Sequence, residues 1–121
     1  MTRVLIVEDE TWLGERFERV LRQEGFMPIL TSNVYSAIDL IDSEKPSVVI
    51  MSLLLSGASG IGLLHELQSY VDTARTPVVV YGSAQLSLTA DELEPYGVRR
   101  LLDATTVKPQ DLVAAVRSVL A

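Results

Sequence analysis

The chain contains no cysteine at any of its 121 positions. Disulfide bonds, thiol nucleophiles and thiolate metal sites are therefore excluded together. The absence fits a reducing compartment, so we expect a cytoplasmic protein. No stretch long enough to span a bilayer is free of charged or polar residues, which excludes a transmembrane helix. The start, Met1 to Leu5, leads directly into a strand-like segment and then into acids, unlike a signal peptide.

Basic residues are few as well. Ten Lys and Arg stand against sixteen Asp and Glu, and the formal net charge is −6. The basic residues form no run or stripe, and phosphate backbones repel an acidic domain. We therefore expect no direct contact with nucleic acid and none with a membrane. A protein partner or a small cation is the better candidate.

The chain does contain short apolar runs that alternate with longer segments of helical period. The predicted strands are residues 3–7, 26–30, 47–51, 78–81 and 98–102. Longer predicted helices lie at about 11–24, 34–43 and 109–120, and a further helix follows the loop at 57–60. Thr89 is the candidate cap of a short helix. This alternation predicts an α/β fold in one domain, residues 1–121, with a parallel sheet covered on both faces.

Five such units match the flavodoxin-like (βα)5 three-layer sandwich, whose sheet has the order 2-1-3-4-5. Pro28 places the second strand at a sheet edge. Ligands bind at the carboxyl ends of strands in these folds, and the first strand ends in Glu8, Asp9 and Glu10. Carboxylate oxygens are the ligands that Mg²⁺ prefers. Alternatively, Glu10 and Glu8 charge the first turn of the next helix, whose dipole favours anions. The sequence favours neither the Mg²⁺ site nor the helix-start role over the other.

The same segments resemble the receiver domains of response regulators in two-component signalling. Residues 4–10 are similar to the opening of these domains, where an acidic pair after strand one holds Mg²⁺. Residues 46–51 and 57–60 resemble the third strand and the loop after it. Residues 76–80 and 97–102 resemble the fourth and fifth strands. The resemblance covers essentially the whole chain, and it implies a phosphorelay signalling protein rather than an enzyme.

The chain departs from this family at several strand ends. Ser52 stands where the family has the aspartate that accepts phosphate from a histidine kinase. Gly82, followed by Ser83, stands where the family has a Thr or Ser that contacts the phosphoryl group. Leu101 replaces an aromatic switch residue, and Ala104 replaces a lysine.

Lys108 and Pro109 look like the family's lysine–proline pair but lie too far along the chain. Lys108 is only four residues before Leu112, the first apolar residue of the last helix's buried stripe. We therefore assign Lys108 to the helix start, with Pro109 at the first helical position and Asp111 in the first turn.

These departures predict a domain that does not accept phosphate. A serine hydroxyl is a weak nucleophile unless a base activates it. The only histidine, His65, lies within a predicted helix and is expected to be a solvated residue. Glu8 and Asp9 are expected to bind Mg²⁺ weakly if they bind it, because the third acid is missing. No cofactor is required.

The favoured function is a phosphorylation-independent protein-interaction module that binds a histidine kinase, an effector or its own copy. The resemblance implies a contact face on the fourth and fifth helices and strand five, which would include Asp91, Glu92, Arg99 and Arg100. One alternative is a Mg²⁺-dependent switch phosphorylated on Ser52 or a nearby acid. The other is a small-ligand domain, although no glycine-rich phosphate loop follows strand one.

Three apolar features carry further expectations. Trp12 is expected to be half-buried beside the start of the first helix, with a cover over the acids or a partner surface as alternatives. Tyr81, the last residue of a buried strand, is expected to belong to the core, with a role related to the family's aromatic switch residue as the alternative. Leu53 to Leu55 predict either a lengthened third strand or an exposed apolar patch.

Overall fold

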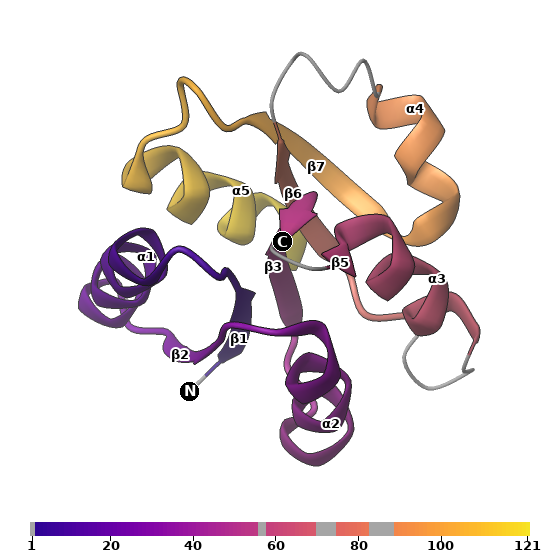
Figure 1. Ribbon diagram of the computed structural model, residues 1–121. Helices are drawn as coiled ribbons and strands as arrows, with labels where there is room; N and C mark the ends of the chain where they lie inside the picture. Colours follow the sequence, from indigo (N-terminus) through magenta and orange to yellow (C-terminus); the bar gives the residue numbers. More distant parts are fainter. Residues whose placement is uncertain (1, 56–57, 70–74, 83–88) are drawn as a thin grey trace.

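Five parallel strands form one sheet in this computed structural model, which describes residues 2–55, 58–69, 75–82 and 89–121. The strands are β1 (Arg3–Val7), β2 (Met27–Thr31), β3 (Val48–Ser52), β6 (Val78–Gly82) and β7 (Val98–Asp103). Their order is β2-β1-β3-β6-β7, which is 2-1-3-4-5 along the chain (Figure 1). The predicted flavodoxin-like order is confirmed, and Pro28 lies in an edge strand as expected.

The helices cover both faces of this sheet. They are α1 (Thr11–Gln23), α2 (Val34–Glu44), α3 (Gly60–Ser69), α4 (Ala90–Leu93) and α5 (Pro109–Leu120), with a 3₁₀ helix η2 (Glu94–Tyr96) after α4. Figure 1 shows α1 and α5 on one side of the sheet and α2, α3 and α4 on the other. Among the described residues, no helix has the length and apolar character needed to cross a membrane.

Local capping chemistry fixes where two of these helices begin. The side chain of Asn33 accepts a hydrogen bond from the backbone N–H of Ser36 at 2.8 Å and caps α2. Thr89 caps α4 in the same way, accepting from the backbone N–H of Glu92 at 3.2 Å. Such caps satisfy backbone donors that a helix leaves unpaired at its start. The predicted role of Thr89 is confirmed.

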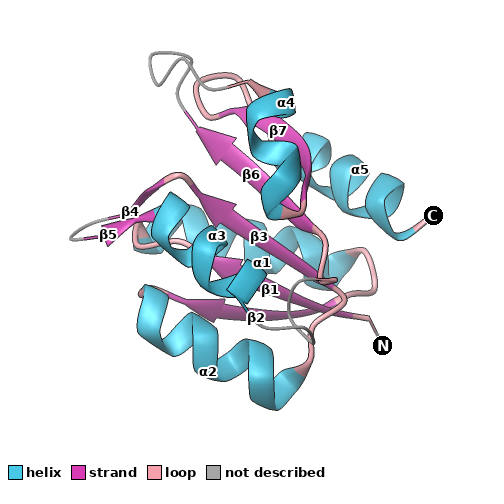
Figure 2. Cartoon of the chain, turned by 90° about the vertical axis from the view of Figure 1, so that its right-hand side faces the viewer, coloured by secondary structure: helices cyan, strands magenta, loops and turns pink. Residues whose placement is uncertain are grey.

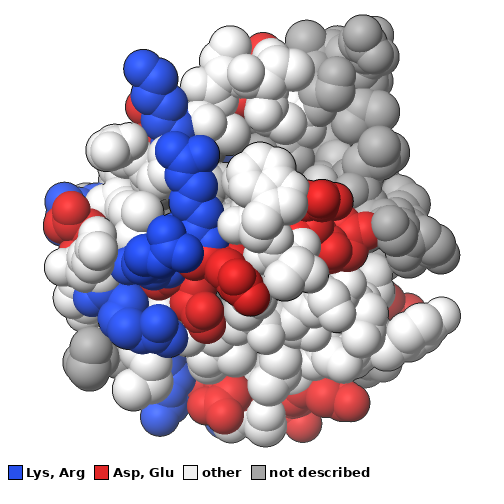
Figure 3. Space-filling view, turned by 60° about the vertical axis from the view of Figure 1, so that its left-hand side comes forward, with Lys and Arg blue, Asp and Glu red and all other residues white. Residues whose placement is uncertain are grey.

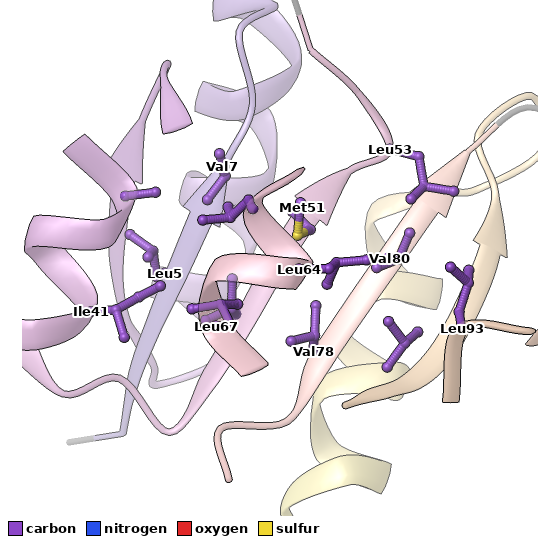
Figure 4. Packing of buried hydrophobic residues seen from close by; sticks show 14 residues of the cluster. Leu5, Val7, Ile41, Met51, Leu53, Leu64, Leu67, Val78, Val80 and Leu93 are labelled. Atoms are coloured by element: carbon purple, nitrogen blue, oxygen red, sulfur yellow. The ribbon is translucent and has the colours of Figure 1, made fainter. Parts of the chain in front are cut away.

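The core consists of two apolar layers, one on each face of the sheet, because alternate residues of each strand point to opposite faces. Figure 4 shows side chains of the layer under α2, α3 and α4, among them Leu5, Val7, Ile41, Met51, Leu53, Leu64, Leu67, Val78, Val80 and Leu93. The layer under α1 and α5 includes Val4, Ile6, Phe17, Leu21, Ile50, Tyr81, Leu112 and Val116. Each fully buried aliphatic side chain contributes about 1.5–3 kcal/mol, so the strand bodies hold the strand ends in place.

The segment after β3 does not lengthen the third strand, and Leu53 is not part of an exposed patch. The strand ends at Ser52, and Leu53 turns into the core, where it is only 4% exposed. The chain then enters a short antiparallel hairpin made of β4 (Leu54–Leu55) and β5 (Ala58–Ser59), at the arrowhead end of β3 in Figure 2. Instead of a longer third strand, a separate hairpin follows it.

The expected half-buried position of Trp12 is wrong. Its side chain is 61% exposed, and its indole Nε1 donates a hydrogen bond to the Glu10 carboxylate at 2.9 Å. Trp12 lies five residues before the buried Phe17, which is about 140° around the helix. The side chain therefore projects from the solvent side of α1.

Candidate functional site

The carboxyl ends of β1, β3 and β6 bring three polar side chains together on one face of the sheet. Glu8 follows β1 directly, and Ser52 is the last residue of β3. Tyr81 of β6 is the register partner of Ser52. Because side chains alternate along strands, all three lie on the face that α1 and α5 cover. All three residues are buried.

Both oxygens of the Glu8 carboxyl group are hydrogen-bonded. Oε1 accepts a short hydrogen bond from the Tyr81 hydroxyl group, and Oε2 accepts from the backbone N–H of Glu10 at 2.9 Å. Gly14 lets α1 approach closely, since a Cβ at this position would lie 3.6 Å from the Glu8 Cβ and 2.8 Å from a methyl carbon of Leu30. The Glu8 residue is only 5% exposed, so it is tied into the protein rather than presented to solvent.

Burial governs the acid–base properties of this pair. It raises the pKa of Glu8 above its ordinary value of 4.5, although the hydrogen bonds from Tyr81 and from the Glu10 N–H act in the opposite direction. Burial also raises the pKa of Tyr81, and its hydrogen bond to Glu8 adds to that effect. Tyr81 therefore remains a protonated phenol, able to donate to Glu8 over the ordinary pH range.

Tyr81 is a core residue, as predicted, but it has a polar partner that the sequence analysis missed. The residue is 2% exposed, and its ring meets the ring of Phe17 edge-on at a centroid distance of 5.5 Å. A buried tyrosine usually finds a hydrogen-bond partner for its hydroxyl group. Tyr81 ends a predicted buried strand, and the first strand ends in acids. Applied to these two features, the rule could have predicted an acidic partner for the Tyr81 hydroxyl group.

The residues at this site do not fit the Mg²⁺ ion that the family resemblance implies. The described part of the chain holds no group of three or more His, Cys, Asp or Glu that could bind a metal ion. Ser52 offers no carboxylate, and both oxygens of Glu8 already accept hydrogen bonds. Asp9 also has an interaction of its own. No chemistry at this site is therefore assigned to a metal ion.

The alternative role of the acids, in charging the start of α1, is not seen for Glu8. No acid lies in the first turn of α1, and Glu10 stands at its N-cap without a capping side-chain hydrogen bond. The Glu10 side chain instead accepts from the Trp12 indole.

The other predicted switch positions meet through the backbone. Gly82 ends β6, and its carbonyl oxygen accepts from the backbone N–H of Ala104 at 3.0 Å. Leu101 is half-buried in β7. Ser83 lies outside the described residues. Gly82 and Ala104 are thus adjacent, but neither residue type carries a hydroxyl or an ammonium group.

The end of β7 carries an acid that the sequence analysis did not single out. The Asp103 carboxylate accepts from the backbone N–H of Thr105 at 2.9 Å and from its hydroxyl group at 2.7 Å. These hydrogen bonds lower the pKa of Asp103, which is exposed. The contacts order the turn that follows β7.

Lys108 is the helix-start residue that its spacing predicts. It is exposed at the N-cap of α5, and its backbone N–H donates to the Asp111 carboxylate at 3.0 Å. Pro109 is the first residue of the helix. His65 is likewise an exposed residue of α3, as expected, and its ring meets that of Tyr96 at 4.8 Å.

The predicted partner surface is only partly brought together. Asp91 of α4 and Arg99 of β7 help to line one open hollow of about 160 Å³. Glu92 is exposed but interacts with Thr89 at the start of α4. Arg99 and Arg100 are both exposed, because the pairing of β7 with β6 shifts register between Val98 and Arg100.

Comparison with known proteins agrees with this fold. The profile of the response regulator receiver domain matches residues 4–117. The phosphate regulon transcriptional regulatory protein PhoB of Escherichia coli is 32% identical over 124 residues, which cover 98% of this chain and 51% of PhoB. The chain therefore spans about half the length of PhoB.

Two further relatives are similar over most of their own length. The sporulation initiation phosphotransferase F of Bacillus subtilis is 23% identical over 110 residues, which cover 84% of this chain and 89% of that protein. The CheY-like response regulator receiver domain from Methylobacillus flagellatus has the same fold, with a TM-score of 0.83 at 20% identity over 98% of both chains. The chain thus belongs to the response regulator receiver domain family, whose members are modules of two-component signalling.

Proposed function

We propose that this receiver domain acts without phosphorylation, as a protein-interaction module in two-component signalling. The observation that best supports the proposal is the environment of Ser52, which stands where the family resemblance places the phosphate-accepting aspartate. A serine hydroxyl needs a base to become a good nucleophile. Glu8, an acid on the same face of the sheet, has both oxygens engaged by Tyr81 and by the backbone of Glu10.

The surroundings of Ser52 also offer little to a transferred phosphoryl group. Such a group carries up to two negative charges and needs fixed cations or donors around it. Gly82 and Ala104, at the positions where the family has a hydroxyl and a lysine, supply neither. Lys108 is held at the start of α5 by the contact between its backbone and Asp111. At the positions that the structure describes, phosphorylation of Ser52 would therefore add charge beside acids without a cation to compensate it.

The partner surface that we favour lies on α4 and β7. Its residues are Asp91, Glu92, Arg99 and Arg100, and all four are exposed. Mixed charges of this kind select partners and set the rate of encounter more than they add affinity. The partner would be a histidine kinase, an effector protein or a second copy of the chain. The side of the molecule on which α1 lies in Figure 1 also presents Lys and Arg beside Asp and Glu (Figure 3).

The proposal is tested by offering a small phosphoryl donor. The protein is incubated with acetyl phosphate and Mg²⁺, and its intact mass is measured with and without acid treatment. We expect no added phosphoryl group. An acid-labile adduct would show an acyl phosphate on a carboxylate, and an acid-stable adduct that Ser52→Ala abolishes would show a serine ester. Either adduct contradicts the proposal.

A further inference from the structure

The Tyr81 side chain is fixed in place from several directions. Its backbone is paired on one side with Ser52 of β3 and on the other with Leu102 of β7. Its ring packs edge-on against Phe17 of α1. With 2% of the residue exposed, the ring has no open space into which to turn, so its hydroxyl group is held toward the Glu8 carboxyl group.

This arrangement sets a polar donor at the oxygen that a cation would need. Mg²⁺ requires oxygen ligands in near-ideal octahedral geometry and gives up its waters reluctantly. A cation reaching Glu8 Oε1 competes with the Tyr81 hydroxyl for the lone pairs and the orientation of this oxygen. Where the cation wins, the buried phenol is left without its partner. An unpaired buried hydroxyl is unfavourable. The backbone N–H of Glu10 already uses the second oxygen.

We propose that Tyr81 is a positioning residue that closes the acidic pocket to divalent cations by holding the Glu8 carboxyl group in an internal hydrogen bond. Ser52 is then only one of two obstacles to metal binding. Tyr81 is the second, and it acts even when a carboxylate is restored at the end of β3. The inference deepens the proposed function and rests on it for its place in signalling.

The consequence is that Ser52→Asp alone does not rebuild a metal site. The register pairs position 52 with Tyr81, so a carboxylate introduced there lies beside the phenol that holds Glu8. The new acid adds negative charge, but the first oxygen ligand stays occupied. Removing the Tyr81 hydroxyl as well frees Glu8 to act together with the introduced acid.

The experiment compares four proteins in a Mg²⁺ titration: the wild type, Ser52→Asp, Tyr81→Phe and the double variant. Trp12 is the only tryptophan, and its indole contacts Glu10, two residues from Glu8, so its fluorescence reports on the pocket. The double variant should bind Mg²⁺ about tenfold more tightly than Ser52→Asp alone. A ratio below about threefold overturns the proposal, and a larger ratio supports it.

The matched control is Ser52→Asp combined with Tyr35→Phe. Tyr35 is 81% exposed on α2, so its hydroxyl group should have no effect on Mg²⁺ affinity. An equal gain in this variant would mean that removing any tyrosine hydroxyl has the same effect, which contradicts the proposal. This result is independent of the phosphoryl-donor test. Phosphorylation of the wild-type protein would contradict the proposed function, but it would not change the ratio of Mg²⁺ affinities between the double variant and Ser52→Asp.

A second measurement on the wild type covers the case in which Tyr81→Phe does not fold. Tyrosine labelled with ¹³C at the hydroxyl-bearing ring carbon gives an NMR signal for Tyr81, assigned from the intact protein. If Mg²⁺ binds, the NMR signal of Tyr81 and the fluorescence of Trp12 should change with the same midpoint concentration. If Mg²⁺ does not bind, neither should change. A Trp12 response with an unchanged Tyr81 signal would show that the cation and the hydrogen bond coexist, which overturns the proposal.

Discussion

The bodies of the strands and their carboxyl ends follow different rules in this protein. Ile50, in the body of β3, is fully buried among apolar side chains. Ser52, two residues further along the same strand and on the same face, is buried beside an acid and a phenol. The strand bodies stabilise the sheet by burying apolar area, whereas the carboxyl ends of the strands carry the polar side chains of the candidate site. This separation places most of the stability of the fold away from the residues at the strand ends.

The largest expected effect comes from a matched pair of substitutions in β3. Ile50→Ala should lower the free energy of unfolding by about 2–5 kcal/mol, because it leaves a cavity in a packed layer. Ser52→Ala should lower it by about 1 kcal/mol or less, since it removes only a hydroxyl group and its hydrogen bonding. Urea denaturation measures both values. Equal losses would show that the strand end contributes to the core as much as the body does.

The next effect concerns the hydrogen bond at the strand ends. Tyr81→Phe should lower the free energy of unfolding by about 1–3 kcal/mol, because the buried Glu8 carboxyl group loses a donor while the packing on Phe17 stays. Tyr35→Phe, at an exposed position, should change it by less than about 0.5 kcal/mol. Urea denaturation of both variants checks the difference, and a neutral Tyr81→Phe would mean that the hydrogen bond adds nothing to stability.

The dependence of stability on pH should carry the signature of Glu8. Its pKa in the folded protein is raised by burial, so folding favours the protonated carboxyl group. This stabilisation is complete below the ordinary pKa of 4.5 and is lost as the pH rises through the folded-state pKa. Relative to Glu8→Gln, the wild type should therefore lose stability above about pH 4.5, by at most about 1.4 kcal/mol per pH unit. A difference that is constant with pH would contradict this assignment.

Asp103 at the end of β7 should show the opposite sign. The hydrogen bonds from Thr105 lower its pKa below the ordinary value of 3.8. Its contribution is present above that value and is lost as the pH falls through the lowered pKa. Acid unfolding of Asp103→Asn should therefore lack this low-pH component, and the effect should be small because the residue is exposed. A steeper acid transition in the variant would contradict the assignment.

The smallest effect on stability is expected on the partner surface. Arg99→Ser and Arg100→Ser should each change the free energy of unfolding by less than about 0.5 kcal/mol, because both side chains are exposed. Urea denaturation checks this, and any loss of kinase or effector binding in these variants then reflects the surface itself. A larger destabilisation would mean that the irregular pairing at Arg99 supports the sheet.

The sequence predicts the strand bodies well because their signal is local. The five strands of the parallel sheet lie within one residue of the predicted ranges at each end, and α5 spans Pro109 to Leu120 as expected. Runs of β-branched residues and the proline at a helix start report directly on backbone conformation. The alternation of strands and helices predicts a parallel sheet, and the match of five such units to the flavodoxin-like fold predicts its order.

The strand ends are harder to predict, since their chemistry depends on distant contacts. No local sequence pattern predicts the hydrogen bond from the Tyr81 hydroxyl group to Glu8, because the register between β1, β3 and β6 brings the two residues together. Trp12 was misplaced for a different reason. Its position relative to Phe17 follows from the helical period and indicates the solvent side of α1. The half-buried expectation rested only on its place beside the helix start.

The hydrogen bond between Glu8 and Tyr81 joins residues that are 73 positions apart in the chain. It cannot form until β1, β3 and β6 have assembled side by side, so we expect it late in folding, after much of the loop-closure entropy has been lost. An interaction absent from the folding transition state changes the rate of unfolding more than the rate of folding. We therefore expect the pair to slow unfolding more than it speeds folding, which would lengthen the lifetime of the native state.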